Sequence, residues 1–203
     1  VTLRSLVAIY EWPVDDLDQS YARDGLNRYT SVGGVTFSYQ GDDGARGNLT
    51  SDGSRNFNYD LENRLIDVSG GATGTLAYDP LGRLRAYTAG GVALEFLYDG
   101  DRLVGEYAPN ELEDPVRRYV HGPGVDEPLI WYEGAATNTG QNWLIADRQG
   151  SIIATTDGSG AATTYAYGPY GEPVAWGGSR FRYTGQIMLP ELRLYHYKAR
   201  VYD

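Results

Sequence analysis

The sequence predicts an almost entirely β-structured protein made of consecutive antiparallel hairpins, each about 20 residues long. Three observations predict it. Turn-forming dipeptides recur at short intervals, and the segments between them alternate apolar and polar residues with a period of two. In addition, no stretch of a dozen residues free of Gly and Pro has the 3.6-residue period of an amphipathic helix.

The turn dipeptides are Asp-Gly and Gly-Gly, which reach positive φ angles at low cost and favour type I′ and II′ hairpin turns. Asp-Gly pairs start at Asp24, Asp43, Asp52, Asp99 and Asp157, and Gly-Gly pairs start at Gly33, Gly70, Gly90 and Gly177. The clearest hairpin joins 83–89 to 92–98 through Gly90-Gly91. On its second strand Val92, Leu94, Phe96 and Tyr98 share one face, and on its first strand we expect Leu84, Ala86 and Thr88 to share a face.

A repeat of Tyr-Asp, a turn and Arg-Leu organises the middle of the chain. Tyr39, Tyr59, Tyr78, Tyr98 and Tyr119 follow one another at intervals of 20, 19, 20 and 21 residues. Three of them open a fuller unit, namely 59–65, 78–84 and the shorter 98–103. We expect the Tyr to end a strand, the Asp side chain to bond turn amides, and Arg-Leu to begin the next strand. Recurrence at this spacing predicts that the tyrosines of successive hairpins stack on one another.

Composition excludes several classes of function. The 203 residues contain no Cys and two His, so disulfides, thiolate metal sites and Cys nucleophiles are absent. A net charge of −10 opposes a phosphate backbone, so we expect no nucleic-acid partner. No apolar run is long enough to span a bilayer. The apolar segment 1–10 is predicted to be a strand, and because the chain does not start with Met we expect it to be an excised piece or a processed product rather than a complete translation unit.

The repeat resembles that of the Rhs/YD-repeat family of bacterial polymorphic-toxin shells, which is named for its Tyr-Asp pair. Residues 146–151, 156–160 and 167–173 resemble the segment that precedes the Rhs core, and 182–186 and 194–203 resemble the core-associated signature itself. The resemblance covers roughly residues 25–203. We therefore divide a single domain, 1–203, into leading strands (1–24), YD repeats (25–120), pre-core hairpins (121–178) and the core signature (179–203).

The resemblance implies a curved, spiralling sheet that forms part of a hollow β-cocoon around a C-terminal toxin. Two residues depart from the family pattern: Arg193 stands where a Gly is usual, and Leu189-Pro190 stands where Asp-Pro is common. The family's self-cleavage motif and toxin would follow Asp203, so we expect this chain to represent the last portion of a shell without either.

No residue is predicted to be catalytic, to bind a cofactor or to ligate a metal. His121 and His196 are interpreted as structural or surface residues, and Gly158-Ser159-Gly160 as a turn. The paired carboxylates Asp15-Asp16, Asp42-Asp43 and Asp99/Asp101 could hold Ca²⁺ weakly or act as an acid/base pair, but turn acidity is the better interpretation. The sequon at Asn48 means little in a bacterial-type protein.

Three functions remain open at this point. The favoured one is a non-enzymatic shell segment that encloses a toxin in its parent protein and, when truncated, associates with copies of itself or other YD-repeat chains through open sheet edges. A secreted or surface module that binds carbohydrate through exposed tyrosines and Trp12, Trp131, Trp143 and Trp176 is the alternative. A hydrolase using an acidic pair has no motif behind it. Location outside the bacterial cell follows from the resemblance alone.

Overall fold

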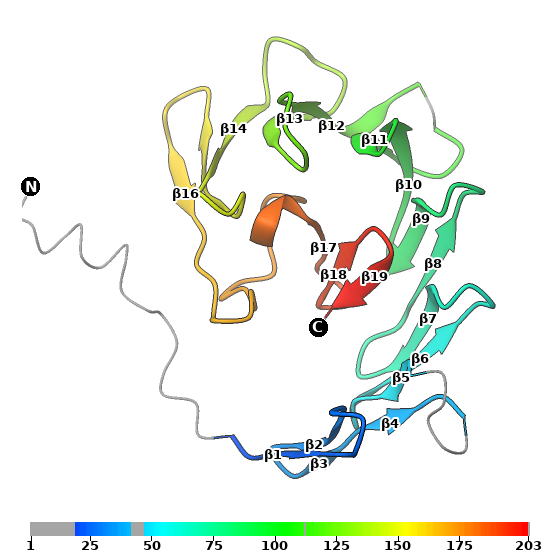
Figure 1. Ribbon diagram of the computed structural model, residues 1–203. Coiled ribbons are helices and arrows are strands. Elements are labelled where there is room, and N and C mark those ends of the chain that lie inside the picture. Colours follow the sequence, from blue (N-terminus) through cyan, green and yellow to red (C-terminus); the bar gives the residue numbers. More distant parts are fainter. Residues whose placement is uncertain (1–18, 42–46, 112, 203) are drawn as a thin grey trace, which may run out of the picture.

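One long open sheet forms most of the molecule (Figure 1). The computed structural model describes residues 19–41, 47–111 and 113–202. In this part of the chain no α-helix occurs, and therefore no helix that could cross a membrane. Thirteen strands, β4 to β16, lie in chain order and each pairs antiparallel with the next. The all-β, hairpin-by-hairpin prediction is confirmed. The expected strand at 1–10 lies outside the described residues.

The strands of the large sheet are short, and all of them are connected by turns or loops. Their bounds are Ser38–Tyr39 (β4), Leu49–Ser51 (β5), Arg55–Tyr59 (β6), Leu65–Gly70 (β7), Gly74–Tyr78 (β8), Leu84–Ala89 (β9), Val92–Asp99 (β10), Arg102–Tyr107 (β11), Pro115–His121 (β12), Pro128–Glu133 (β13), Gln141–Ala146 (β14), Ile152–Asp157 (β15) and Ala162–Thr164 (β16). A small sheet of β1 (Tyr21–Arg23), β2 (Tyr29–Val32) and β3 (Val35–Thr36) precedes it. The Phe37 amide donates to the Thr30 carbonyl at 3.0 Å, which links the two sheets.

The connections fall alternately on the two long rims of the sheet. One rim, which we call the Asp-turn rim, carries the turns at 24–28, 60–64, 79–83, 99–102 and 147–151 and the loop 122–127. The other, the glycine rim, carries Gly33-Gly34, 52–54, 71–73, Gly90-Gly91 and the longer loops before β12 and β14. At Gly90-Gly91 both φ angles are positive, 57° and 82°, as a type I′ hairpin requires. The predicted hairpin of β9 and β10 is confirmed, with Val92 opposite Ala89.

The turns at Asp24, Asp60 and Asp79 have one construction. In the β6–β7 turn, Oδ1 of Asp60 accepts hydrogen bonds from the Glu62 and Arg64 amides, both at 2.9 Å, and Oδ2 accepts from Nε of Arg64 at 2.7 Å. Asp24 and Asp79 repeat this set of bonds. The predicted role of the Asp is therefore confirmed.

Positive φ in these turns falls on the third residue after the Asp: Asn27, Asn63, Gly82, Gly150 and Gly160. The Asp-Gly pairs at Asp24 and Asp157 do not provide it, because Gly25 and Gly158 are not in the left-handed region. Asp52-Gly53 and Asp99-Gly100 do, with φ of 84° at Gly53 and 57° at Gly100. Asp43-Gly44 lies outside the described residues.

A β-bulge sits beside most of the Asp turns, although the strands that flank the Asp157 turn pair in continuous register. Tyr78 pairs with Leu84 while the preceding Ala77 pairs with Ala86, so Arg85 is an extra residue on the returning strand. The same two-for-one step occurs immediately before Arg23, Tyr39, Tyr59, Tyr98 and Ala146. The bulge shifts the alternation, so Leu84, Tyr87 and Ala89 are buried and Thr88 is exposed. The expectation that Leu84, Ala86 and Thr88 share one face is wrong for this reason. Bulges bend a strand and increase its twist, which curls the sheet.

The C-terminal segment lies inside the curve of the sheet (Figure 1). It contains a short 3-10 turn, Tyr183–Gly185, and a three-stranded sheet of β17 (Ile187–Leu189), β18 (Leu194–Tyr197) and β19 (Arg200–Tyr202). Its apolar side chains join those of the concave face in one core, which includes Phe57, Leu65, Val68, Leu76, Leu84, Tyr87, Leu94, Phe96, Leu103, Phe181, Leu189, Leu192 and Leu194.

A buried ion pair fastens this segment to the sheet. Nε and Nη2 of Arg180 donate to the two oxygens of Glu106 at 2.8 and 3.0 Å, and Nη1 donates to the Met188 carbonyl at 2.9 Å. The Tyr119 hydroxyl also donates to Glu106. Although its burial opposes ionisation, Arg180 holds the pKa of Glu106 below its usual value. Every charge in this network is paired, as burial demands.

Candidate functional site

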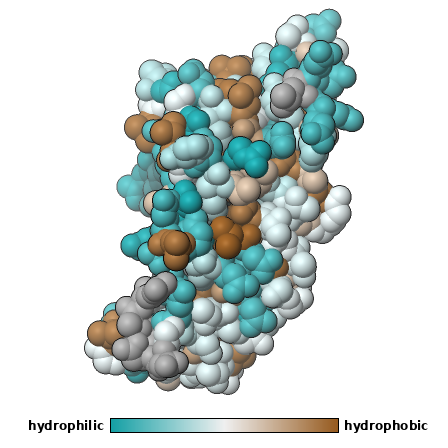
Figure 2. All heavy atoms as spheres, turned by 90° about the vertical axis from the view of Figure 1, so that its right-hand side faces the viewer, coloured by the Kyte–Doolittle hydropathy of each residue, from teal (hydrophilic) through white to brown (hydrophobic). Residues whose placement is uncertain are grey.

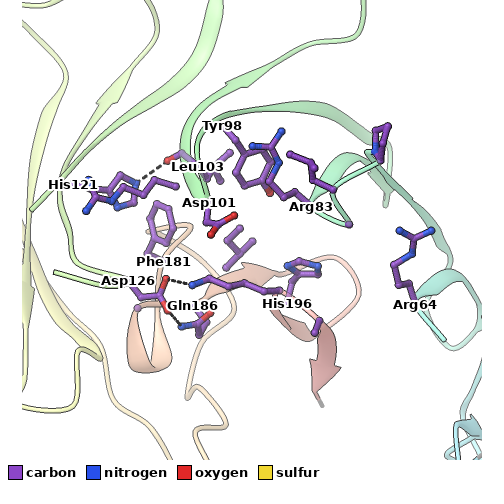
Figure 3. A pocket seen from close by; sticks show the side chains of 18 of the residues that line it. Arg64, Arg83, Tyr98, Asp101, Leu103, His121, Asp126, Phe181, Gln186 and His196 are labelled. Atoms are coloured by element: carbon purple, nitrogen blue, oxygen red, sulfur yellow. Dashed lines mark hydrogen bonds and ion pairs between the residues drawn. The ribbon is translucent and has the colours of Figure 1, made fainter. Parts of the chain in front are cut away.

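A cleft of about 520 Å³ opens between the Asp-turn rim and the C-terminal segment (Figure 3). Its inner surface is apolar and comes from both sides, with Tyr98 and Leu103 from the sheet and Phe181 and Ile187 from the C-terminal segment. Charged side chains stand around it: Glu62, Arg64, Arg83, Asp101, Arg102, Asp126 and Lys198. Concave sites with an apolar lining and a few polar groups are where proteins bind ligands.

His196 is the most unusual residue of this cleft. It lies on β18 with 3% of its surface exposed, and neither ring nitrogen has a hydrogen-bond partner among the described residues. Its ring is 6.0 Å from that of Tyr78, between centroids. Burial lowers the pKa of His196 to about 4, so the ring is neutral at neutral pH. A buried polar group without a partner is costly, and its position at the cleft calls for an explanation.

His121 lies across the cleft at the end of β12. One ring nitrogen, Nε2, is 2.8 Å from the Leu103 carbonyl, and Nδ1 has no partner in the described part of the chain. The ring meets that of Phe181 edge to face, with centroids 5.3 Å apart. Burial lowers the pKa of His121 as well. Both histidines were expected to be structural or surface residues, and the structure places both in the lining of the cleft.

An ion pair closes one side of the cleft. Nζ of Lys198 lies 2.8 Å from Oδ1 of Asp126, and the Gln186 amide donates to Oδ2 of the same carboxylate at 2.8 Å. Asp126 has a φ of 52°, so the loop before β13 places this carboxylate from a left-handed conformation. These bonds join the loop before β13 to the C-terminal segment.

A ladder of tyrosines leads along the sheet to the cleft. The Tyr78 hydroxyl donates to the Leu65 carbonyl at 2.8 Å, and the Tyr98 hydroxyl to the Leu84 carbonyl at 3.0 Å. Tyr39 and Tyr59 bond in the same way to the carbonyls of Tyr29 and Leu49. Each hydroxyl therefore reaches the first residue of an earlier strand.

The ring partners of these tyrosines differ from the prediction. Arg64 lies over the Tyr78 ring at 5.0 Å and Arg83 over the Tyr98 ring at 5.1 Å, and Arg28 stands over Tyr39 in the same way. No ring contact joins Tyr39, Tyr59, Tyr78 and Tyr98 to one another. The expected Tyr-on-Tyr stacking is wrong: the rings of Tyr39, Tyr78 and Tyr98 each face the Arg of the preceding turn, which the Asp of that turn holds in place.

The fifth tyrosine of the repeat, Tyr119, does not take part in the ladder. Tyr119 has the predicted spacing, but its side chain is buried against Glu106 and Phe181. His121 occupies the ladder position instead, since its ring bonds to the Leu103 carbonyl as Tyr98 bonds to Leu84.

The carboxylates and Ser159 behave as turn residues. Asp99 ends β10, and Asp101 lies in the β10–β11 turn at the cleft. Within the described ranges, no group of three or more His, Cys, Asp or Glu is arranged to hold a metal ion. The Ser159 hydroxyl donates to Asp157 at 2.7 Å inside a turn. Asn48 bonds to Gln40 and Asn63. Asp15-Asp16 and Asp42-Asp43 lie outside the described residues.

The three described tryptophans do not form one platform. Trp131 is buried and donates to Glu133 at 2.9 Å. Trp143 pairs with Ile130, on the opposite face of the sheet from Trp131, and is 40% exposed. Trp176 packs on Tyr195, with ring centroids 5.7 Å apart. Trp12 lies outside the described residues, and carbohydrate binding stays a prediction.

No family model matches the chain, so its family is not assigned by that comparison. Individual proteins and solved structures do resemble it. The chain is 28% identical over 190 residues to the tRNA3(Ser)-specific nuclease WapA of Bacillus spizizenii and 28% identical over 189 residues to the tRNA nuclease WapA of Bacillus subtilis. Each alignment covers 88% of this chain and 8% of the relative. The chain thus spans less than a tenth of these relatives.

Solved structures share the fold. The Photorhabdus luminescens Tc holotoxin pore matches 91% of this chain with a TM-score of 0.57 at 14% identity, and the TcdB2-TccC3 crystal structure matches 80% with a TM-score of 0.51 at 16% identity. The matches span 11% and 9% of those chains. The curved sheet of hairpins is therefore a fold found in large toxin proteins.

Proposed function

We propose that this chain is a wall segment of a larger Rhs/YD-repeat protein of the polymorphic-toxin type, secreted or displayed by a bacterium, and that its role is structural rather than enzymatic. The wall would enclose a toxin or another polypeptide on its concave side. The similarity to WapA nucleases and to Tc toxin structures supports a toxin context. Each of those proteins is many times longer than this chain, which supports a segment of a larger protein.

The observation that carries the proposal is the use of the concave face. The sheet already encloses a polypeptide there, its own residues 165–202, with the core on one side and the Glu106–Arg180 pair within it. A surface that buries one segment of chain in this way is suited to surrounding more of it. The first and last strands of the sheet system, β1 and β16, have exposed side chains throughout. No described strand pairs with the outer edge of β1 or of β16, and we expect these edges to pair with further strands of the wall.

Protease protection of the parent protein tests this role. The enclosed polypeptide should resist proteinase K in the intact parent and become sensitive when Arg180→Met detaches the C-terminal segment from the wall. Glu111→Gln, which changes an exposed loop carboxylate, should leave the protection intact. Equal digestion of the enclosed polypeptide in the intact parent and the Arg180→Met variant would contradict the proposal.

A further inference from the structure

The pattern of the tyrosine ladder breaks where the ladder meets the cleft. In three earlier turns the Arg that follows the Asp lies over a tyrosine ring, at 4.7, 5.0 and 5.1 Å. Arg102 has the corresponding place in the β10–β11 turn and lines the cleft. Its Nη2 donates to the Pro123 and Gly124 carbonyls at 3.4 Å each, which are long bonds. Within the described ranges, no aromatic ring lies under Arg102 and no carboxylate pairs with it.

His121, on the next strand, also lacks a partner that the ladder supplies elsewhere. Its Nε2 faces the Leu103 carbonyl, and because a carbonyl only accepts hydrogen bonds, Nε2 carries the ring proton. Burial lowers the pKa of His121, so the ring is neutral at neutral pH. Nδ1 is therefore an acceptor, and it has no donor in the part of the chain that the structure describes. A group that satisfies it has to supply an O–H or N–H.

The rest of the cleft suits an uncharged aromatic group. The rings of Tyr98 and Phe181 line it from opposite sides. Most of the charged side chains around it are already paired, as Lys198 is with Asp126 at 2.8 Å. His196, on the C-terminal side, is buried and neutral, so one of its unpartnered nitrogens donates and the other accepts. A hydroxyl group both donates and accepts, and therefore complements either histidine.

We propose that the cleft is a binding site for a phenol group, whose ring stacks on the Arg102 guanidinium and whose hydroxyl donates to Nδ1 of His121. The bound group repeats the arrangement at Tyr78, where the hydroxyl donates to an acceptor and an Arg lies over the ring. The volume of about 520 Å³ is in the range of small-molecule sites. Nδ1 is covered in this structure, and a small turn of the His121 ring about its Cβ–Cγ bond exposes it at low cost.

Nitrogen NMR of the full chain with isotope-labelled histidine tests the site, because the chemical shift of a ring nitrogen reports its hydrogen bonding. The chain has two histidines, so the signals are assigned by replacing each in turn. We expect p-cresol to bind saturably and to shift the Nδ1 signal of His121. Toluene and 4-methylanisole have the same ring without the O–H donor, and should bind about tenfold more weakly, the effect of one hydrogen bond.

Substitutions at the two proposed contacts test the geometry. His121→Phe keeps a ring against Phe181 and removes the acceptor, so p-cresol and toluene should then bind equally. Arg102→Gln removes the cation and should weaken p-cresol binding about threefold. Arg85→Gln makes the same change on the convex face, where Arg85 is 55% exposed beside Glu95, and should leave binding unchanged. Figure 2 shows this outer side of the sheet, where hydrophobic groups lie scattered among hydrophilic ones. Circular dichroism establishes that each variant is folded.

A phenol group has two sources, a free molecule or a tyrosine of another polypeptide. Competition of N-acetyl-tyrosinamide with p-cresol, without competition by N-acetyl-phenylalaninamide, would identify a tyrosine; binding of p-cresol alone would identify a free phenol. Toluene that binds as tightly as p-cresol, an Nδ1 signal that does not move, or p-cresol binding unchanged by His121→Phe would each overturn the proposal. The cleft forms within this chain, so these results are independent of the proposed shell function and of its protease test.

Discussion

Arg193 has a φ of 54°, in the left-handed region that costs an L-residue about 1–2 kcal/mol. Its side chain is exposed, and it stands at the position where the resemblance implies a Gly. Replacement by Gly removes this strain but adds conformational entropy to the unfolded chain. We expect Arg193→Gly to raise the free energy of unfolding by about 0.5–1 kcal/mol in urea denaturation. Arg193→Lys keeps the strain and should give no gain; a loss of stability in the Gly variant would contradict this account.

The buried His196 makes stability depend on pH. The unfolded imidazole takes up a proton below pH about 6.5, whereas the folded one stays neutral until pH about 4. Stability is therefore lost as the pH falls between these values, by about 3 kcal/mol at most. His196→Phe keeps a ring of similar size without this titration. The difference in unfolding free energy should shift in favour of the variant as the pH falls from 6.5 to 4, and parallel pH curves for the two proteins would disprove it.

The sequence pattern predicted which residues form the turns and the repeat, but it did not predict which side chains the tyrosines contact. The Asp turns follow directly from local chemistry, because an Asp side chain can reach amides two and four residues ahead. The partner of the Tyr39, Tyr78 and Tyr98 rings is an Arg from the preceding turn, about 14 residues away for Tyr78, which no local pattern specifies. His121 replaces a Tyr in the ladder because the chain before β12 is longer than in the other units.

At the level of the hairpin, the Tyr ladder couples neighbouring units. Loss of the Tyr78 hydroxyl leaves the Leu65 carbonyl without its 2.8 Å bond in a largely buried place. We expect Tyr78→Phe to lower the free energy of unfolding by about 1 kcal/mol. Tyr170→Phe, at an exposed ring, should change it by much less. Chemical denaturation measures both, and equal effects at the two sites would contradict a role for the ladder.

The order and pairing of the strands were predictable because each hairpin is local and its turns carry distinct dipeptides. The bulges were not, since an extra residue beside an Asp turn has no residue signature. Arg85 has no sequence feature that distinguishes it from other polar strand residues. Its role as the extra residue of the bulge is visible only in the pairing of β8 with β9. The error in the predicted face of Thr88 comes from this single residue.

At the scale of the whole molecule, a buried ion pair helps the shared apolar core to hold the C-terminal segment in place. Removing one partner leaves an unpaired charge in the core, so Arg180→Met should cost about 3–5 kcal/mol. The double variant Glu106→Leu with Arg180→Met should recover part of this loss, because no unpaired charge remains, although the Tyr119 hydroxyl and the Met188 carbonyl each lose a hydrogen bond. A double-mutant cycle in urea gives the coupling energy. Additive effects of the two changes would show that the pair does not fasten the segment.

This placement could not be predicted from the sequence. Glu106 and Arg180 are 74 residues apart, and each is unremarkable in its own strand or loop. The cleft exists only because of this long-range contact, since its lining comes from the Asp turns on one side and from Phe181, Ile187 and His196 on the other. The spacing of the repeat predicts how the strands of the sheet pair. It does not predict where the C-terminal segment packs against that sheet.

The bulges also bear on how such a protein can change in length. The extra residue of each bulge is part of the repeat unit in which it occurs, so duplication of a unit also duplicates its bend. Duplication of residues 60–78 would insert two strands, one turn of each kind and one bend, with the Asp, Arg and Tyr of the new unit ready to engage those of its neighbours. A lineage can therefore lengthen or shorten the wall by whole units while its curvature per unit stays constant, and the space enclosed becomes a property that gene duplication can adjust.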